Sequence, residues 1–165
     1  MGGKKHNGKR INLQEANALF CDVFAELADS DISTTISLAG SARRHKKICG
    51  DIDIVIVPKS TDQFDAWCIE KFGLLKNGKP ARTGLIEGVQ VEFYVATSEN
   101  YGSQLQMWTG SKFHNIKLRR LSKSKGFSMS QYGFKHLETK ELVTCSTELS
   151  VYEFLGTPFV PAQSR

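Results

Sequence analysis

Two aspartates stand two residues apart in the otherwise apolar segment DIDIVIV, residues 51–57. In a strand, alternate residues face the same side, so Asp51 and Asp53 would project together. Ile52 and Ile54 would then face the core. Burying an ionised carboxylate is costly unless it is paired or bound to a metal. Two carboxylates at a strand end suit a pair of divalent cations. The sequence therefore predicts a site for two Mg²⁺ ions, a metal that leaves room for water and phosphate, with Mn²⁺ as a possible replacement.

A third carboxylate, Glu92, lies in the apolar segment VQVEFYV, residues 89–95. Alternation predicts that Glu92 shares the polar face of a strand with Gln90 and Tyr94. This face suits a metal ligand, and it equally suits an ordinary glutamate on the wet side of a sheet. The geometry relative to the two aspartates has to decide between these interpretations.

The residues before the aspartates are suited to phosphate. Gly40 allows close backbone approach, and Ser41 offers a hydroxyl and an amide to an anion. Arg44 can donate two parallel hydrogen bonds to phosphate oxygens, and Gly50 lets the chain pass close to a substrate. A lone Gly-Ser turn or Asp-x-Asp pair is weak evidence. Their combination in one strand-turn-strand frame favours a nucleotide site over an ordinary turn.

These residues need a scaffold, and the hydrophobic pattern predicts one. Helical spacing predicts helices, and alternation predicts strands. The expected elements are a helix over 11–30, strands over 34–40 and 51–57, a helix over 61–73, a hairpin region over 74–93, two short helices over 103–126 broken at 109–111, a hairpin over 128–145 and a helix over 146–156. This order predicts an α+β fold. Residues 1–100 would form a mixed sheet with flanking helices, and residues 101–165 a smaller helical and hairpin subdomain.

Composition narrows the function. The chain has 165 residues and a net charge of +5, and its basic residues cluster at 4–10, 43–47 and 112–125, a distribution that suits a polyanion such as nucleic acid. No stretch approaches the roughly 20 apolar residues of a membrane span, and no secretory signal is recognisable. The four cysteines form no Cys-x-x-Cys pair, which argues against structural zinc. We expect reduced thiols, an intracellular, cytosol-like compartment and a monomer.

The segment GSARRHKKICGDIDIVI, residues 40–56, resembles the palm motif of the nucleotidyltransferase superfamily, and specifically of the family X, DNA polymerase beta-like enzymes. The resemblance extends further along the chain. WTGSKFHNIKLRRLSKSKGFSMSQYGF, residues 108–134, resembles the thumb signature of that family, and LGTPFVPAQSR, residues 155–165, resembles its C-terminal tail. The palm motif alone would indicate only the superfamily, whereas the thumb and tail are specific.

The resemblance implies roles for individual residues. Metal ligands would be Asp51, Asp53 and Glu92. Nucleotide contacts would come from Gly40, Ser41, Arg44, Cys49, Gly50, Trp108, Thr109, Gly110 and Asn115. DNA contacts would come from Lys112, Lys117, Arg119, Arg120, Lys123 and Lys125. Four positions depart from the family pattern: Glu92 replaces Asp, Gln90 replaces a basic residue, Met107-Trp108 replaces an aromatic pair, and Cys49 replaces a hydroxyl residue.

The resemblance further implies a template-directed DNA polymerase that fills short gaps in DNA repair. It would transfer a nucleotide from a dNTP to a primer 3′-hydroxyl with two Mg²⁺ ions, on gapped or primer-template DNA and without a membrane. The palm-plus-thumb form resembles minimal viral members, and we expect no lyase domain. Two alternatives stay open: a nucleotidyltransferase that works without a template or on a small molecule or protein, and a non-catalytic DNA-binding relative.

Overall fold

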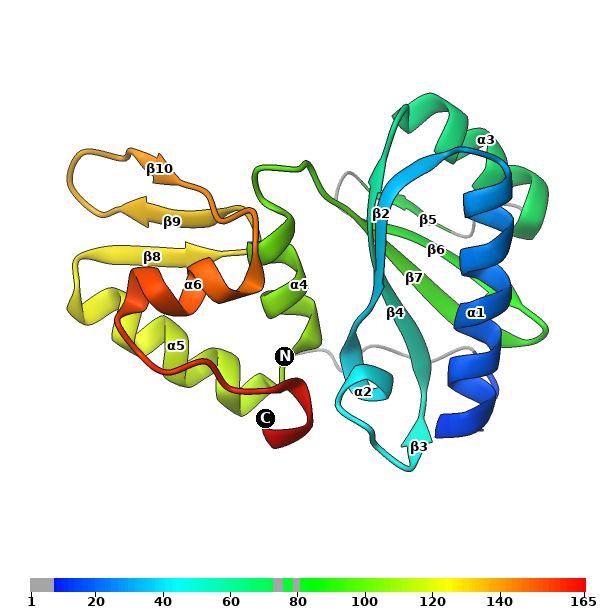
Figure 1. Ribbon diagram of the computed structural model, residues 1–165, viewed down its shortest axis with the longest axis horizontal. Coiled ribbons are helices and arrows are strands. Elements are labelled where there is room, and N and C mark those ends of the chain that lie inside the picture. Colours follow the sequence, from blue (N-terminus) through cyan, green and yellow to red (C-terminus); the bar gives the residue numbers. More distant parts are fainter. Residues whose placement is uncertain (1–7, 73–75, 79–80) are drawn as a thin grey trace.

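The structure is a computed structural model that describes residues 8–72, 76–78 and 81–165 (Figure 1). Parts of the predicted basic cluster at 4–10 and of the predicted hairpin region at 74–93 lie outside these ranges. Within them, no helix is both long enough and apolar enough to cross a bilayer. A five-stranded sheet with two long helices lies beside a smaller region of helices and short strands (Figure 1). This arrangement confirms the predicted α+β class.

The first region contains the large sheet. Its elements are β1 (Ile11–Asn12), α1 (Leu13–Asp29), β2 (Ser33–Leu38), α2 (Gly40–Arg43), β3 (Ile48–Cys49), β4 (Asp51–Pro58), α3 (Thr61–Phe72), β5 (Lys76–Gly78), β6 (Ala81–Ile86) and β7 (Val89–Val95). The strand order is β2-β4-β7-β6-β5, and only the central pair β4-β7 is parallel. The sheet is therefore mixed, as predicted.

Helices α1 and α3 cover one face of this sheet. Helix α1 begins with a capping box, in which the Asn12 side chain accepts from the Glu15 amide and the Glu15 carboxylate accepts from the Asn12 amide. Apolar residues at helical spacing in α1 and α3 pack against Ile52, Ile54 and Phe93 of the central strands. This core fixes the direction of every second side chain in β4 and β7.

The second region begins with a helix that packs on the opposite face of the sheet. The elements after β7 are α4 (Tyr101–Thr109), α5 (Lys112–Ser124), β8 (Phe127–Ser130), β9 (Gly133–His136), β10 (Leu142–Val143), α6 (Glu148–Leu155) and a 3-10 turn, η1 (Ala162–Ser164). Leu105 of α4 is buried against Val55 of β4 and Tyr94 of β7. Helix α4 thus joins the sheet to the smaller region (Figure 1).

The smaller region has its own core, in which α5 and α6 pack against the sheet β10-β9-β8. Phe134 and Tyr152 are almost completely buried there. The predicted hairpin over 128–145 is extended by the third strand, β10. A second difference concerns the predicted strand over 34–40, which ends at Leu38, because Gly40 begins the one-turn helix α2.

Candidate active site

Asp51, Asp53 and Glu92 lie in the same part of the sheet because β4 and β7 are parallel neighbours. Their register pairs Asp53 with Glu92, and Asp51 with Gln90. Asp51 and Asp53 are partly exposed, whereas Ile52 between them is completely buried. The alternation predicted for residues 51–57 is therefore confirmed. The register also resolves the position of Glu92, which lies beside Asp53 and not on a remote part of the sheet.

Glu92 does not lie on a wet face. Gln90, Glu92 and Tyr94 share one face, as predicted, but all three are buried, and α4 packs over Tyr94 through Leu105 and Trp108. Gln90 Nε2 donates to Glu92 Oε1 at 2.8 Å, and Tyr94 Oη lies 2.5 Å from Glu92 Oε2. The same phenol oxygen lies 3.1 Å from Asp53 Oδ1. Burial raises the pKa of Tyr94, and the charges of Asp53 and Glu92 raise it further, so the phenol keeps its proton.

The donor set suits a divalent cation. Carboxylate oxygens are the ligands that Mg²⁺ prefers, and Asp51 and Asp53 present them at a partly exposed strand end. The backbone at Gly40 approaches Asp53 so closely that a Cβ there would lie 1.9 Å from Asp53 Oδ2. Within the described ranges, however, no three His, Cys, Asp or Glu side chains are grouped closely enough to form a metal site. Glu92 is held by its protein partners.

The predicted phosphate residues lie next to these acids. Ser41 Oγ is buried and, among the described residues, has no hydrogen-bond partner, so a ligand oxygen could satisfy it. Arg44 Nη1 donates to the carbonyl of Thr109. Burial lowers the pKa of Arg44, while Asp53 raises it. Cys49 differs from these residues because its side chain is completely buried in the core.

The predicted nucleotide residues of α4 and α5 are held by side-chain contacts. Trp108 stacks on Tyr94, with ring centroids 3.7 Å apart and an interplanar angle of 9°. Asn115 Nδ2 donates to the Met107 carbonyl at 2.8 Å, and Gln106 Nε2 donates to Asn115 Oδ1 at 2.9 Å. Gly110 ends α4 with a φ of 71°, which favours glycine. The stack places Trp108 against Tyr94, whose phenol contacts Asp53 and Glu92.

A buried ion-pair network joins α2 to the smaller region. Arg43 donates to both carboxylate oxygens of Glu148, at 3.0 and 2.9 Å, and to Thr109 Oγ1 at 2.7 Å. Arg165, whose side chain is completely buried, donates to Glu148 Oε1 at 2.7 Å. The sequence prediction gave no role to Arg43 or Glu148. The tail resemblance was the one signal that pointed to Arg165.

Replacing Glu148 by glutamine should destabilise the fold by about 3 kcal/mol at neutral pH, because two guanidinium groups then lose their shared carboxylate. Burial alone would raise the pKa of Glu148, but hydrogen bonds from Arg43 and Arg165 outweigh it and lower the pKa below 4.5. The contacts of Glu148 with Arg43 and Arg165 therefore contribute stability above about pH 4.5. This stability is lost as the pH falls through the pKa of Glu148 in the folded protein.

Urea unfolding between pH 3 and 7 measures this difference. The difference in free energy of unfolding between wild type and Glu148→Gln should become smaller in acid. Glu153→Gln, an exposed change on the same helix, is the control and should leave stability within about 0.5 kcal/mol of wild type. A constant gap over the whole range would contradict the ion-pair explanation.

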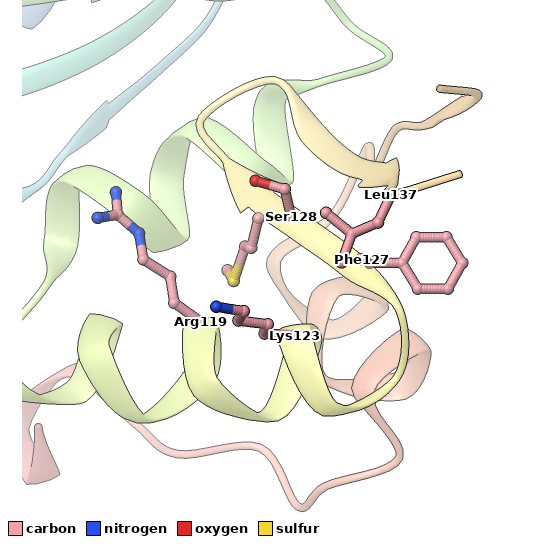
Figure 2. Close-up of a pocket in the computed structure, with 6 residues that line it drawn as sticks. Arg119, Lys123, Phe127, Ser128 and Leu137 are labelled. Atoms are coloured by element: carbon pink, nitrogen blue, oxygen red, sulfur yellow. The ribbon is translucent and has the colours of Figure 1, made fainter. Parts of the chain in front are cut away.

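The basic residues of α5 are exposed and form more than one face. Lys112, Arg119 and Lys123 follow one another at spacings of seven and four residues, so they line one side of the helix. Lys117 lies on another side. Arg119 and Lys123 border a cavity of about 330 Å³ between α5 and β8, whose other lining residues are Phe127, Ser128, Met129 and Leu137 (Figure 2). This side of the region presents positive charge next to apolar surface.

Fold and site together define a class of protein: a nucleotidyltransferase palm that carries paired carboxylates, followed by a basic thumb. The DNA polymerase beta palm family matches residues 10–121, and the DNA polymerase beta thumb family matches residues 104–165. The chain belongs to the family X DNA polymerases. The predicted family is thereby confirmed.

Individual proteins support the same assignment. The chain is 30% identical over 135 residues to the DNA polymerase/3′-5′ exonuclease PolX of Bacillus subtilis (strain 168). It is 26% identical over 166 residues to DNA polymerase lambda of Arabidopsis thaliana. The fold is similar to that of polymerase beta of Leishmania infantum, solved as a ternary P/T complex, with a TM-score of 0.78, 18% identity, and coverage of 97% of this chain and 78% of that one.

The match covers only part of the curated relatives. The alignments cover 78% and 79% of this chain, but 24% of the Bacillus protein and 31% of the Arabidopsis protein. The chain therefore spans about a quarter to a third of the length of these relatives.

Proposed function

We propose that this chain is a template-directed DNA polymerase that fills short gaps during DNA repair. The observation that carries the proposal is the register of the two central strands, which sets Asp53 beside Glu92. Asp51 lies two residues earlier on the same strand as Asp53. Enzymes that transfer a nucleotide place such carboxylates where the primer end meets the triphosphate. The substrates would be a dNTP and gapped or primer-template DNA.

Each group of residues has a defined task in this proposal. Asp51, Asp53 and Glu92 would hold two Mg²⁺ ions, which would activate the primer hydroxyl and neutralise the leaving pyrophosphate. Ser41 and Arg44 would hold the triphosphate, and for this Arg44 would exchange its contact with the Thr109 carbonyl for phosphate oxygens. The two larger hydrophobic clusters support a division into a palm over 1–100 and a thumb over 101–165, although α4 also packs on the palm sheet. The chain would act as a monomer.

Primer extension on a one-nucleotide gap, with a single dNTP offered at a time, tests the proposal. A template-directed polymerase adds only the complementary nucleotide and stops when the gap is filled. Addition of any nucleotide irrespective of the template would favour a template-independent transferase. Tight DNA binding without incorporation, at any Mg²⁺ or Mn²⁺ concentration, would favour a non-catalytic relative.

DNA binding should weaken steeply with salt, because cations on α5 would displace counterions from DNA phosphates. The double variant Arg119→Ala, Lys123→Ala should make the negative slope of log affinity against log salt shallower by roughly 2, about one unit for each phosphate contact that is lost. Fluorescence anisotropy with labelled gapped DNA measures the slope. Lys71→Ala, which removes a cation paired with Glu26 in the palm, is the control. An unchanged slope in the double variant would mean that other residues bind the DNA.

A further inference from the structure

Tyr94 occupies an unusual place between two acids. Its phenol oxygen lies 2.5 Å from Glu92 Oε2 and 3.1 Å from Asp53 Oδ1. The shorter distance is typical of a hydroxyl that donates to an ionised carboxylate. Since Gln90 donates to the other oxygen of Glu92, both carboxylate oxygens of this residue accept a hydrogen bond from a side chain. The two donors fix the direction in which the carboxylate faces.

The phenol is also held in place by packing. Tyr94 is 2% exposed, and its ring lies flat against the indole of Trp108. Trp108 Nε1 donates to Gln104 Oε1 at 2.6 Å, and Gln104 Nε2 donates to the Val95 carbonyl at 3.2 Å. Helix α4 therefore holds the indole, the indole holds the phenol, and the phenol holds the carboxylate.

Such hydrogen bonds leave the carboxylate able to bind a cation. A carboxylate can accept hydrogen bonds and bind a metal ion at the same time, because its two oxygens together offer about four lone-pair sites. Carboxylates that ligate metals are commonly oriented by hydrogen bonds from neighbouring groups, and these neighbours strengthen metal binding. Glu92 has one more rotatable bond than an aspartate, so a fixed donor restricts more alternatives here.

We propose that Tyr94 is a positioning residue that holds Glu92 beside Asp53 and thereby raises the affinity of the site for a divalent cation. Tyr94 acts through the carboxylate and does not touch the cation. The inference rests on the metal site of the proposed function. It also accounts for a glutamate where the family usually has aspartate, because Gln90 and Tyr94 hold the carboxylate of the longer side chain.

Mn²⁺ binding to the full chain tests this inference without any turnover. Free Mn²⁺ is measured by electron paramagnetic resonance while the ion is titrated into protein, with a non-hydrolysable dNTP present. Tyr94→Phe, which removes one oxygen and keeps the stacked ring, should weaken Mn²⁺ binding about 10- to 100-fold. Gln90→Met, which removes the other donor to Glu92, should weaken it in the same direction.

Tyr101→Phe is the matched control, because it removes a phenol that also lies 2.5 Å from its partner, the neutral hydroxyl of Ser37. It should leave Mn²⁺ affinity within about twofold of wild type. Thermal unfolding without metal checks that each variant is folded. If the affinity of Tyr94→Phe is unchanged or higher, Tyr94 is a packing residue or a competitor for the carboxylates, and the inference is overturned. If wild type binds no Mn²⁺ at all, the metal site itself is wrong, and the inference falls with it.

Discussion

Asp53→Asn is expected to lower the rate of nucleotide incorporation by on the order of 1,000-fold, because the proposed metal ligand, which would support several kcal/mol of transition-state stabilisation, is lost. Asp51→Asn should have an effect of the same order. The fold and the DNA affinity should persist, since asparagine keeps the shape of aspartate and removing one charge relieves the repulsion within the acid cluster. The partial exposure of both aspartates favours retention of the fold in these variants.

Single-turnover incorporation on gapped DNA measures the rate, and anisotropy in the same buffer measures DNA affinity. Asp22→Asn, an exposed aspartate on α1, is the control and should keep the wild-type rate. Incorporation by Asp53→Asn at a rate close to wild type would remove the metal assignment. A loss of DNA binding equal to the loss of rate would show instead that the variant has lost its structure.

Glu92→Gln is expected to reduce incorporation by roughly 100- to 1,000-fold, because it removes the charge while keeping the length of the side chain. Glu92→Asp is the more informative change. Its carboxylate falls one methylene short of the position that Gln90 and Tyr94 hold, and a misplacement of about 1 Å can cost about 100-fold in rate. We expect a loss of roughly 10- to 100-fold.

Both Glu92 variants are compared by single-turnover incorporation at saturating Mg²⁺, so that weaker metal binding is separated from slower chemistry. An aspartate variant as fast as wild type, or faster, would mean that glutamate is only tolerated at this position. Wild-type activity in Glu92→Gln would assign the third ligand to another residue. Either result would leave the Asp51 and Asp53 assignment intact.

The sequence by itself determined the local geometry of the site. Alternation along a strand follows from covalent geometry, so the pattern of residues 51–57 was enough to place Asp51 and Asp53 on one side and Ile52 on the other. The helices α1 and α3 were predicted within a few residues, because their apolar spacing is a local signal. The family could be recognised for a related reason, since its motifs are short and keep their order along the chain.

Only the tertiary structure decided what surrounds those residues. No local pattern states that β7 lies parallel to β4 in the register that sets Glu92 beside Asp53. The polar pattern of residues 89–95 suited a wet face as well as a metal site, yet Tyr94 is buried, because α4 returns from later in the chain to cover it. The contact of Arg43 with Glu148 spans 105 positions of sequence. Such contacts are set by the packing of whole elements, which depends on interactions that no short stretch of sequence contains.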